Sequence, residues 1–108
     1  MIDFKAMDEA VLAAFQGGEG ALCAKMVADD SCRILKGRLA PGSSIGLHTH
    51  ATSSEILFVI EGEGTVVLDG QAERLTPDTA HYCPKGHSHT LKNDGKVDLV
   101  FYAVVPQQ

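Results

Sequence analysis

Two histidines in alternate positions, His48 and His50, are followed by the carboxylate of Glu55 and, much later, by His89. Neutral imidazoles and a carboxylate are the side chains that hold first-row divalent transition metals. In an extended strand, side chains two positions apart point to the same face. An extended segment over residues 47–50 therefore presents both histidines together. The four residues predict a site for a divalent transition metal.

The segments around these residues have the pattern of short strands. A turn-forming run over residues 40–44 precedes the apolar residue Ile45, and Asp69-Gly70 is a typical hairpin turn. Many short strands separated by Gly and Pro turns predict an all-β sandwich or barrel. The expected strands cover residues 21–28, 32–39, 45–50, 55–61, 64–68, 72–75, 79–83, 88–91 and 97–105.

The first run of site residues has the spacing of a known motif. Gly42, His48, His50, Glu55 and Gly62, with the intervals between them, resemble the first motif of the cupin superfamily in full. A lone pair of alternating histidines is weak evidence, because it occurs in many unrelated proteins. The complete set of five positions is much more specific.

A second run of residues resembles the second cupin motif. It consists of Asp78, Pro84, Gly86, His89 and Asn93, and it departs from the motif at Asp78, where the family usually has Gly. That glycine lies in a turn, and Asp tolerates turn conformations well, so we expect the site to persist. The order of the two motifs is also that of the family.

The resemblance extends over roughly residues 33–105 and implies a fold and a ligand set. The fold is the cupin jelly-roll β-barrel, also called a double-stranded β-helix. The implied metal ligands are the three histidines and Glu55 named above, and Glu55 is in addition a candidate to take a proton in catalysis. The resemblance also implies a homodimer, because a small β-domain protects its exposed strand edges by pairing.

Residues 1–20 form an N-terminal arm ahead of the cupin domain, which we place at residues 21–108. Phe4, Met7, Val11 and Phe15 recur at near-helical spacing, which predicts a short amphipathic helix over residues 4–15. A strand, or an arm wrapped around a partner subunit, stays open as an alternative. In each case the arm packs on the barrel or on a partner.

Further histidines and a cysteine lie close to the second motif. His87 comes just before His89, which makes it a rim residue or a group that orients a metal ligand. His81 and Cys83 share one face of the expected strand. On the inside of the barrel they line the pocket beneath the metal, and on the outside they are core or interface residues. The family usually has an aliphatic residue at the position of Cys83, which favours packing.

Phenolic and cationic side chains complete the set of candidates for ligand binding. Tyr82 and Tyr102 are candidates to donate a hydroxyl group to a substrate, with aromatic packing as the alternative. An anionic substrate requires a positive side chain directed into the barrel, and solvated surface charge is the alternative. The positive residues on the expected strands and hairpins are Arg33, Lys36, Arg38, Arg74, Lys85 and Lys92.

Composition excludes several classes of function. The net charge of −5 disfavours non-specific nucleic-acid binding, which needs a basic surface. No apolar run is long enough for a transmembrane helix, and the first residues lack the pattern of a signal peptide. Three cysteines without a Cys-x-x-Cys pattern indicate reduced thiols, with Cys23 and Cys32 as packing residues. We therefore expect a cytoplasmic protein.

The cupin fold hosts many reactions, so it does not by itself give a function. The complete three-His, one-Glu set favours a metal-dependent enzyme, in which Fe, Mn, Ni or Zn binds a small organic substrate in oxygenase-type chemistry. One alternative is a metal-dependent isomerase, decarboxylase or lyase. The other is a non-enzymatic module that binds or senses a small molecule.

Overall fold

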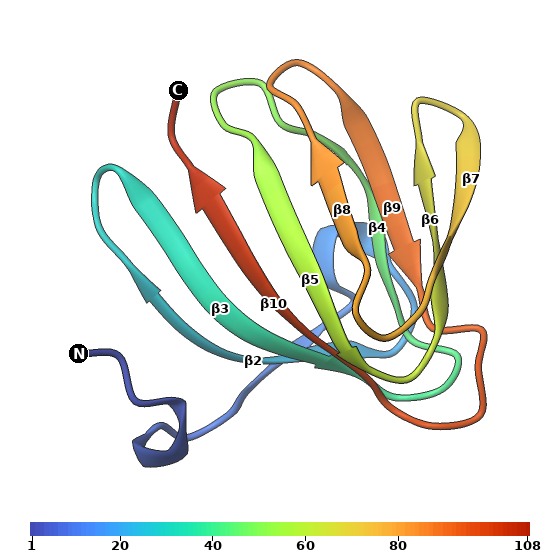
Figure 1. Cartoon of the computed structure of the whole chain (residues 1–108), viewed down its shortest axis with the longest axis horizontal. Helices are drawn as coiled ribbons and strands as arrows, with labels where there is room; N and C mark the ends of the chain where they lie inside the picture. Colours follow the sequence, from blue (N-terminus) through green and yellow to red (C-terminus); the bar gives the residue numbers. More distant parts are fainter.

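Two antiparallel sheets face each other in the computed structural model, which describes residues 1–108 (Figure 1). One sheet has six strands in the order β1-β2-β3-β10-β5-β8, and the other has four in the order β4-β9-β6-β7. This arrangement is the jelly-roll barrel expected from the sequence. The strands are β1 (Ala10–Ala13), β2 (Ala21–Ala28), β3 (Cys32–Leu39), β4 (Ser44–Thr49), β5 (Glu55–Glu61), β6 (Gly64–Leu68), β7 (Gln71–Leu75), β8 (Ala80–Cys83), β9 (Ser88–Lys92) and β10 (Leu99–Pro106).

Alternation along the strands places apolar side chains between the two sheets. In β10, Leu99, Phe101, Ala103 and Val105 are buried, while the residues between them are partly exposed. The opposing sheet contributes Val66, Ile45 and Leu91 to the same continuous core. Full burial of such a side chain contributes roughly 1.5–3 kcal/mol, so this core holds the two sheets together.

Asn93 closes one end of the barrel. Its side chain is fully buried, and its amide nitrogen donates hydrogen bonds to the carbonyl oxygens of Leu39, at 2.7 Å, and Val97, at 2.8 Å. Its side-chain oxygen accepts from the backbone nitrogen of Gly95 at 2.9 Å. These bonds satisfy buried backbone groups where three segments meet, as buried polar atoms require. Asn93, the last residue of the second cupin motif, thus stabilises the closed end of the barrel.

Asp78 occupies the turn position that the family gives to glycine. Its φ angle is +68°, in the left-handed region. Aspartate adopts this region more readily than most residues, because its short polar side chain is compatible with turn geometry. The turn before β8 therefore forms despite the departure from the motif.

The predicted helix over residues 4–15 is wrong. The structure instead has a 3-10 turn, η1 (Phe4–Ala6), then strand β1, then a second 3-10 turn, η2 (Phe15–Gly17). β1 pairs with β2 in an antiparallel register, so hydrogen bonding to a neighbouring strand outweighs the helical spacing of the apolar residues. Ala14, at φ +50°, adopts a left-handed conformation that ends the strand.

The N-terminal arm then packs closely on β4. A Cβ atom on Gly18 would lie 2.1 Å from the carbonyl oxygen of Ser44, so only glycine allows this approach. The hydroxyl group of Ser44 also binds the arm, because it accepts a hydrogen bond from the backbone nitrogen of Glu19 at 2.9 Å. The arm is thus an integral part of the barrel. No helix in the structure has the length and apolar character needed to cross a membrane.

Candidate metal centre

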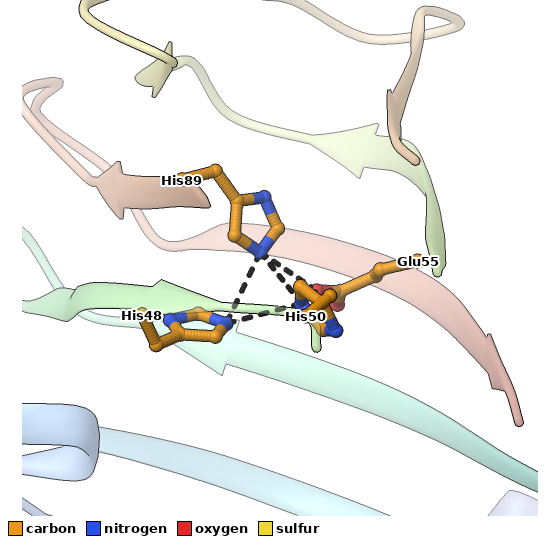
Figure 2. Close-up of side chains that lie close together, drawn as sticks. All are labelled: His48, His50, Glu55 and His89. Carbon is orange, nitrogen blue, oxygen red and sulfur yellow. Dashed lines mark hydrogen bonds and ion pairs between the residues drawn. The ribbon is translucent and has the colours of Figure 1, made fainter. Parts of the chain in front are cut away.

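Four side chains from both sheets converge at the open end of the barrel (Figure 2). His48 lies on β4 and His89 on β9, both in the four-stranded sheet, and they face each other in the register of that pair. Glu55 begins β5 in the six-stranded sheet, and His50 comes directly after β4. Their ligand atoms all lie within 4.8 Å of one another. The structure therefore brings together the same four residues that the sequence indicates as candidate metal ligands.

A β-bulge in β4 directs the two histidines inward. Ile45 pairs with Leu91, and His48 pairs with His89, so β4 has one residue more than β9 between these pairs. The extra residue reverses the alternation of the strand. His48 then points inward like Ile45, although simple alternation would put them on opposite faces. The apolar side chain of Leu47 is correspondingly 69% exposed.

The backbone of the hairpin between β8 and β9 fixes the position of His50. The backbone nitrogen of His50 donates to the carbonyl oxygen of His87 at 3.0 Å, and its carbonyl oxygen accepts from Gly86 at 2.7 Å. His87 therefore supports the site through its backbone. Its side chain is exposed and pairs with Asp69, so it does not touch a ligand of the centre.

The donor spacing fits a set of ligands around one metal ion. The Nε2 atoms lie 3.2 Å apart for His48 and His50, 3.0 Å for His50 and His89, and 3.1 Å for His89 and His48. Glu55 Oε1 lies 3.1 Å from His50 and 3.0 Å from His89. Donors at right angles around an ion, each at roughly 2.1 Å, are roughly 3.0 Å apart.

The pair formed by His48 and Glu55 is the exception to this donor spacing. No hydrogen bond or ion pair joins them, although the whole set lies within 4.8 Å. Donors on opposite sides of an ion are roughly 4.2 Å apart, whereas a tetrahedron spaces all pairs equally. The His48–Glu55 pair is therefore the widest of the set, and the four side chains would hold an ion between them.

Hydrogen bonds at the far side of each ring direct the lone pairs inward. His48 Nδ1 donates to the carbonyl oxygen of Gly46 at 2.8 Å, which leaves Nε2 as an acceptor. His50 Nδ1 contacts Ser53 Oγ at 2.9 Å. Several lone pairs and a carboxylate thus face one point, where their mutual repulsion is relieved by a cation.

The ionisation of the cluster suits a metal as well. Burial raises the pKa of Glu55, but the close contacts of its carboxylate with the rings of His50 and His89 outweigh this effect and lower the pKa to about 2. Burial lowers the pKa of His48, so its ring is neutral at physiological pH. An ionised carboxylate and neutral imidazoles are the forms that bind metals.

His81 supports the cluster from inside the barrel. Its Nε2 lies 2.9 Å from His89 Nδ1, and both residues are 3% exposed. Burial lowers the pKa of His81, which keeps the ring neutral. Its other nitrogen, Nδ1, has no hydrogen-bond partner, and the carboxylate of Glu73 lies 3.6 Å away. The residues therefore form a chain from Glu73 through His81 and His89 to the metal position.

Cys83 shares the inner face with His81 but has a different environment. It is fully buried and pairs with Glu55 in the register of β8 and β5. Burial raises the pKa of the Cys83 thiol to about 11, so the group is protonated and unreactive at neutral pH. It packs beside the centre, as the residue type at this position of the motif indicates.

The two tyrosines lie on the outer face of the six-stranded sheet. Tyr82 is 55% exposed, and Tyr102 alternates with the buried Phe101. The Tyr102 ring packs against Phe4, with the ring centres 5.5 Å apart. This placement directs both hydroxyl groups away from the cavity, since adjacent residues of a strand point to opposite faces.

The centre lies in a cavity with 17 lining residues, of which 10 are hydrophobic. The sequence analysis did not associate Phe15 and Gln16 with the site. Phe15 and Gln16 come from the N-terminal arm, whose path the helix prediction obscured. Arg33, one of the cationic candidates from the sequence, also lines the cavity and lies on β3 at the same alternation as the buried Leu35.

The barrel and the four converging ligands define a metal-binding type of cupin. The sequence model described as "Cupin domain" matches residues 35–105, and the chain belongs to this family. An oxalate-binding protein of Thermotoga maritima is 32% identical over 96 residues, which cover 83% of this chain and 79% of that protein.

Solved structures share the fold over the whole chain. A protein of Thermotoga maritima described as a predicted oxalate decarboxylase is 25% identical, with a TM-score of 0.94 over 100% of this chain and 99% of that one. A cupin sugar phosphate isomerase of Silicibacter pomeroyi has a TM-score of 0.82 at 19% identity, covering 100% of this chain and 76% of that one. The latter similarity extends to the fold alone.

Proposed function

We propose that this protein binds a small organic carboxylate through a divalent transition metal held by His48, His50, Glu55 and His89. The observation that carries the proposal is the donor spacing, in which His48 and Glu55 lie across the cluster from each other. An ion held by these four residues would be open to a chelating ligand from the cavity that they line. The similarity to an oxalate-binding protein supports a carboxylate as that ligand.

The donor set would accept several metals. Three histidine nitrogens and one carboxylate oxygen would suit Mn, Fe, Ni or Zn. When bound, such an ion supplies Lewis acidity that attracts carboxylate oxygens. The chain orients the donors through the partners of their Nδ1 atoms and surrounds the ligand with an apolar wall that excludes water.

The other cavity residues offer one candidate acid for decarboxylation. Loss of carbon dioxide leaves a carbanion, which needs a positioned proton donor. Apart from the four ligands, the ionisable side chains of the cavity are Arg33 and His81. The Nε2 atom of His81 is hydrogen-bonded to His89, and the guanidinium of Arg33 does not release its proton. That leaves the proton on His81 Nδ1, which has no hydrogen-bond partner and lies 3.6 Å from the carboxylate of Glu73, as the one candidate acid for this step.

An oxygenase is the second candidate. Three histidines and one carboxylate would hold a redox-active ion, which would supply the means to activate dioxygen beside an organic substrate. In this reaction Glu55 would stay a ligand, since its pKa of about 2 makes it a poor proton acceptor at neutral pH.

Metal analysis followed by calorimetry tests both candidates. Purified protein is assayed for Mn, Fe, Ni and Zn, and the metal-loaded protein is titrated with oxalate. We expect about one metal per chain and heat of binding only in the metal-loaded form. Oxygen consumption with an added organic acid would instead support the oxygenase, and a protein that binds no metal after reconstitution would refute both.

We also propose that the protein forms a homodimer. The outer face of the six-stranded sheet exposes Phe58, Ile60 and Tyr82, which are 46%, 43% and 55% exposed. Exposed apolar groups of this kind favour association with a partner. A monomeric mass in size-exclusion chromatography with light scattering would contradict the proposal.

A further inference from the structure

We propose that Arg33 determines ligand specificity by binding a second anionic group of the metal-bound ligand, so that short dianionic acids are preferred over monoanions. This inference rests on the proposed function and names the class of carboxylate. Arg33 is the one cation that lines the metal cavity. It lies on β3, at the exposed rim of the cavity.

Strand register places Arg33 at the same level of the sheet as the metal. Arg33 pairs with Val105 on β10. β10 pairs with β5 through Val104 and Ile56, so the next residues, Val105 and Glu55, lie side by side. Arg33, Val105 and Glu55 therefore form a row across three adjacent strands, and all three line the cavity.

The row gives an approximate distance. Adjacent strands are about 4.8 Å apart, so the Cα atoms of Arg33 and Glu55 are roughly 10 Å apart. An extended arginine side chain reaches roughly 6–7 Å from its Cα atom. A guanidinium turned along this row would therefore lie only a few ångströms from an ion held by Glu55, which suits an acid with a short carbon chain.

Arg33 has no acidic partner in the protein. Arg38 forms ion pairs with Glu9 and Asp98, and Arg74 forms ion pairs with two other carboxylates, but no ion pair involves Arg33. A guanidinium is always charged and can donate two parallel hydrogen bonds to a carboxylate. The charge of Arg33 is thus available to a ligand.

The formal charge of the cavity supports a dianion. A divalent ion and the Glu55 carboxylate together carry one positive charge when the imidazoles are neutral. Arg33 adds a second positive charge. A ligand with two negative charges neutralises this pair within a mostly apolar wall, where unbalanced charge is unfavourable. A monoanion of the same size leaves one charge without a partner.

Calorimetry with two acids of similar size tests the inference. Mn-loaded wild-type protein is titrated with oxalate, a dianion, and with glycolate, a monoanion that also chelates metals. The variants are Arg33→Gln, which removes the charge, and Arg33→Lys, which keeps it without the planar donor pair. Lys96→Gln, in the loop at the opposite end of the barrel, removes the same charge and serves as the control. Metal content is measured for every variant.

We expect Arg33→Gln to bind oxalate about tenfold more weakly with unchanged metal content, because Arg33 lies at the solvated rim. Glycolate binding should change much less, Arg33→Lys should recover part of the loss, and Lys96→Gln should match the wild type. Equal losses for both acids, or no loss for oxalate, would overturn the role of Arg33. A metal-loaded wild type that binds neither acid would instead overturn the proposed function.

Discussion

Replacing His81 with leucine should weaken metal binding although His81 is not a ligand. His89 Nδ1 lies 2.9 Å from His81 Nε2, and His81 is neutral because burial lowers its pKa. With His89 as the donor, its Nε2 lone pair is directed at the metal. Leucine removes the acceptor, which leaves a buried N–H group without a partner and allows the His89 proton to move to Nε2.

The magnitude follows from these contacts. An unsatisfied buried donor costs about 1–3 kcal/mol, and loss of a group that orients a metal ligand typically weakens affinity about 10- to 100-fold. Since a tenfold change corresponds to about 1.4 kcal/mol, the two estimates agree. We therefore expect the dissociation constant for Mn or Ni to rise about 10- to 100-fold in His81→Leu.

Competition with a chromophoric chelator measures this change. His81→Gln keeps an acceptor oxygen and should recover part of the affinity. His87→Leu is the matched control, because the side chain of His87 is exposed and pairs with Asp69 outside the centre. Thermal unfolding of the metal-free proteins separates a folding defect from a binding defect. Wild-type affinity in a folded His81→Leu variant would refute the orienting role of His81.

Three further outcomes are expected. His50→Ala should lose most bound metal, as measured by mass spectrometry, because His50 contacts each of the other three donors; stoichiometric metal in this variant would contradict the ligand set. Gly46→Ala should lower both the melting temperature and metal content, because its Cβ atom would lie 2.0 Å from the carbonyl oxygen of Gln16; an unchanged melting temperature would argue against this contact. Glu9→Gln should destabilise the protein by about 0.5 kcal/mol at neutral pH, since Arg38 lowers the pKa of Glu9 and the pair is partly exposed. That contribution is present above the unfolded pKa near 4.5 and disappears as the pH falls through the lower folded value, so denaturant unfolding of the two proteins should converge in acid.

The strands of the barrel could be predicted because turn residues separate them. The observed bounds of β2, β3, β5 and β6 match the predicted ranges, and the other strands differ at their ends. The N-terminal arm could not be predicted in this way. Its apolar residues have helical spacing, and only the pairing of β1 with β2 gives it an extended form. That pairing depends on residues elsewhere in the chain.

The ligand set could be predicted from the two motifs, but its support could not. The bulge that turns His48 inward has Gly46 as its only sequence signal. His87 is closest in sequence to His89, yet it is His81 that contacts the His89 ring. This contact joins strands of opposite sheets, and pairing across the barrel interior leaves no local pattern in the sequence.

Asn93 and the metal centre lie at opposite ends of the same strand. Ser44 pairs with Lys92 near Asn93, whereas His48 pairs with His89 at the other end of β4 and β9. The hydrogen bonds of Asn93 that stabilise the closed end are therefore remote from the metal centre and Arg33, which we propose to select the ligand. Substitutions around Arg33 can accumulate without weakening the closed end. A barrel built in this way can diversify in ligand preference during evolution, and it offers a stable starting point for redesigning the cavity.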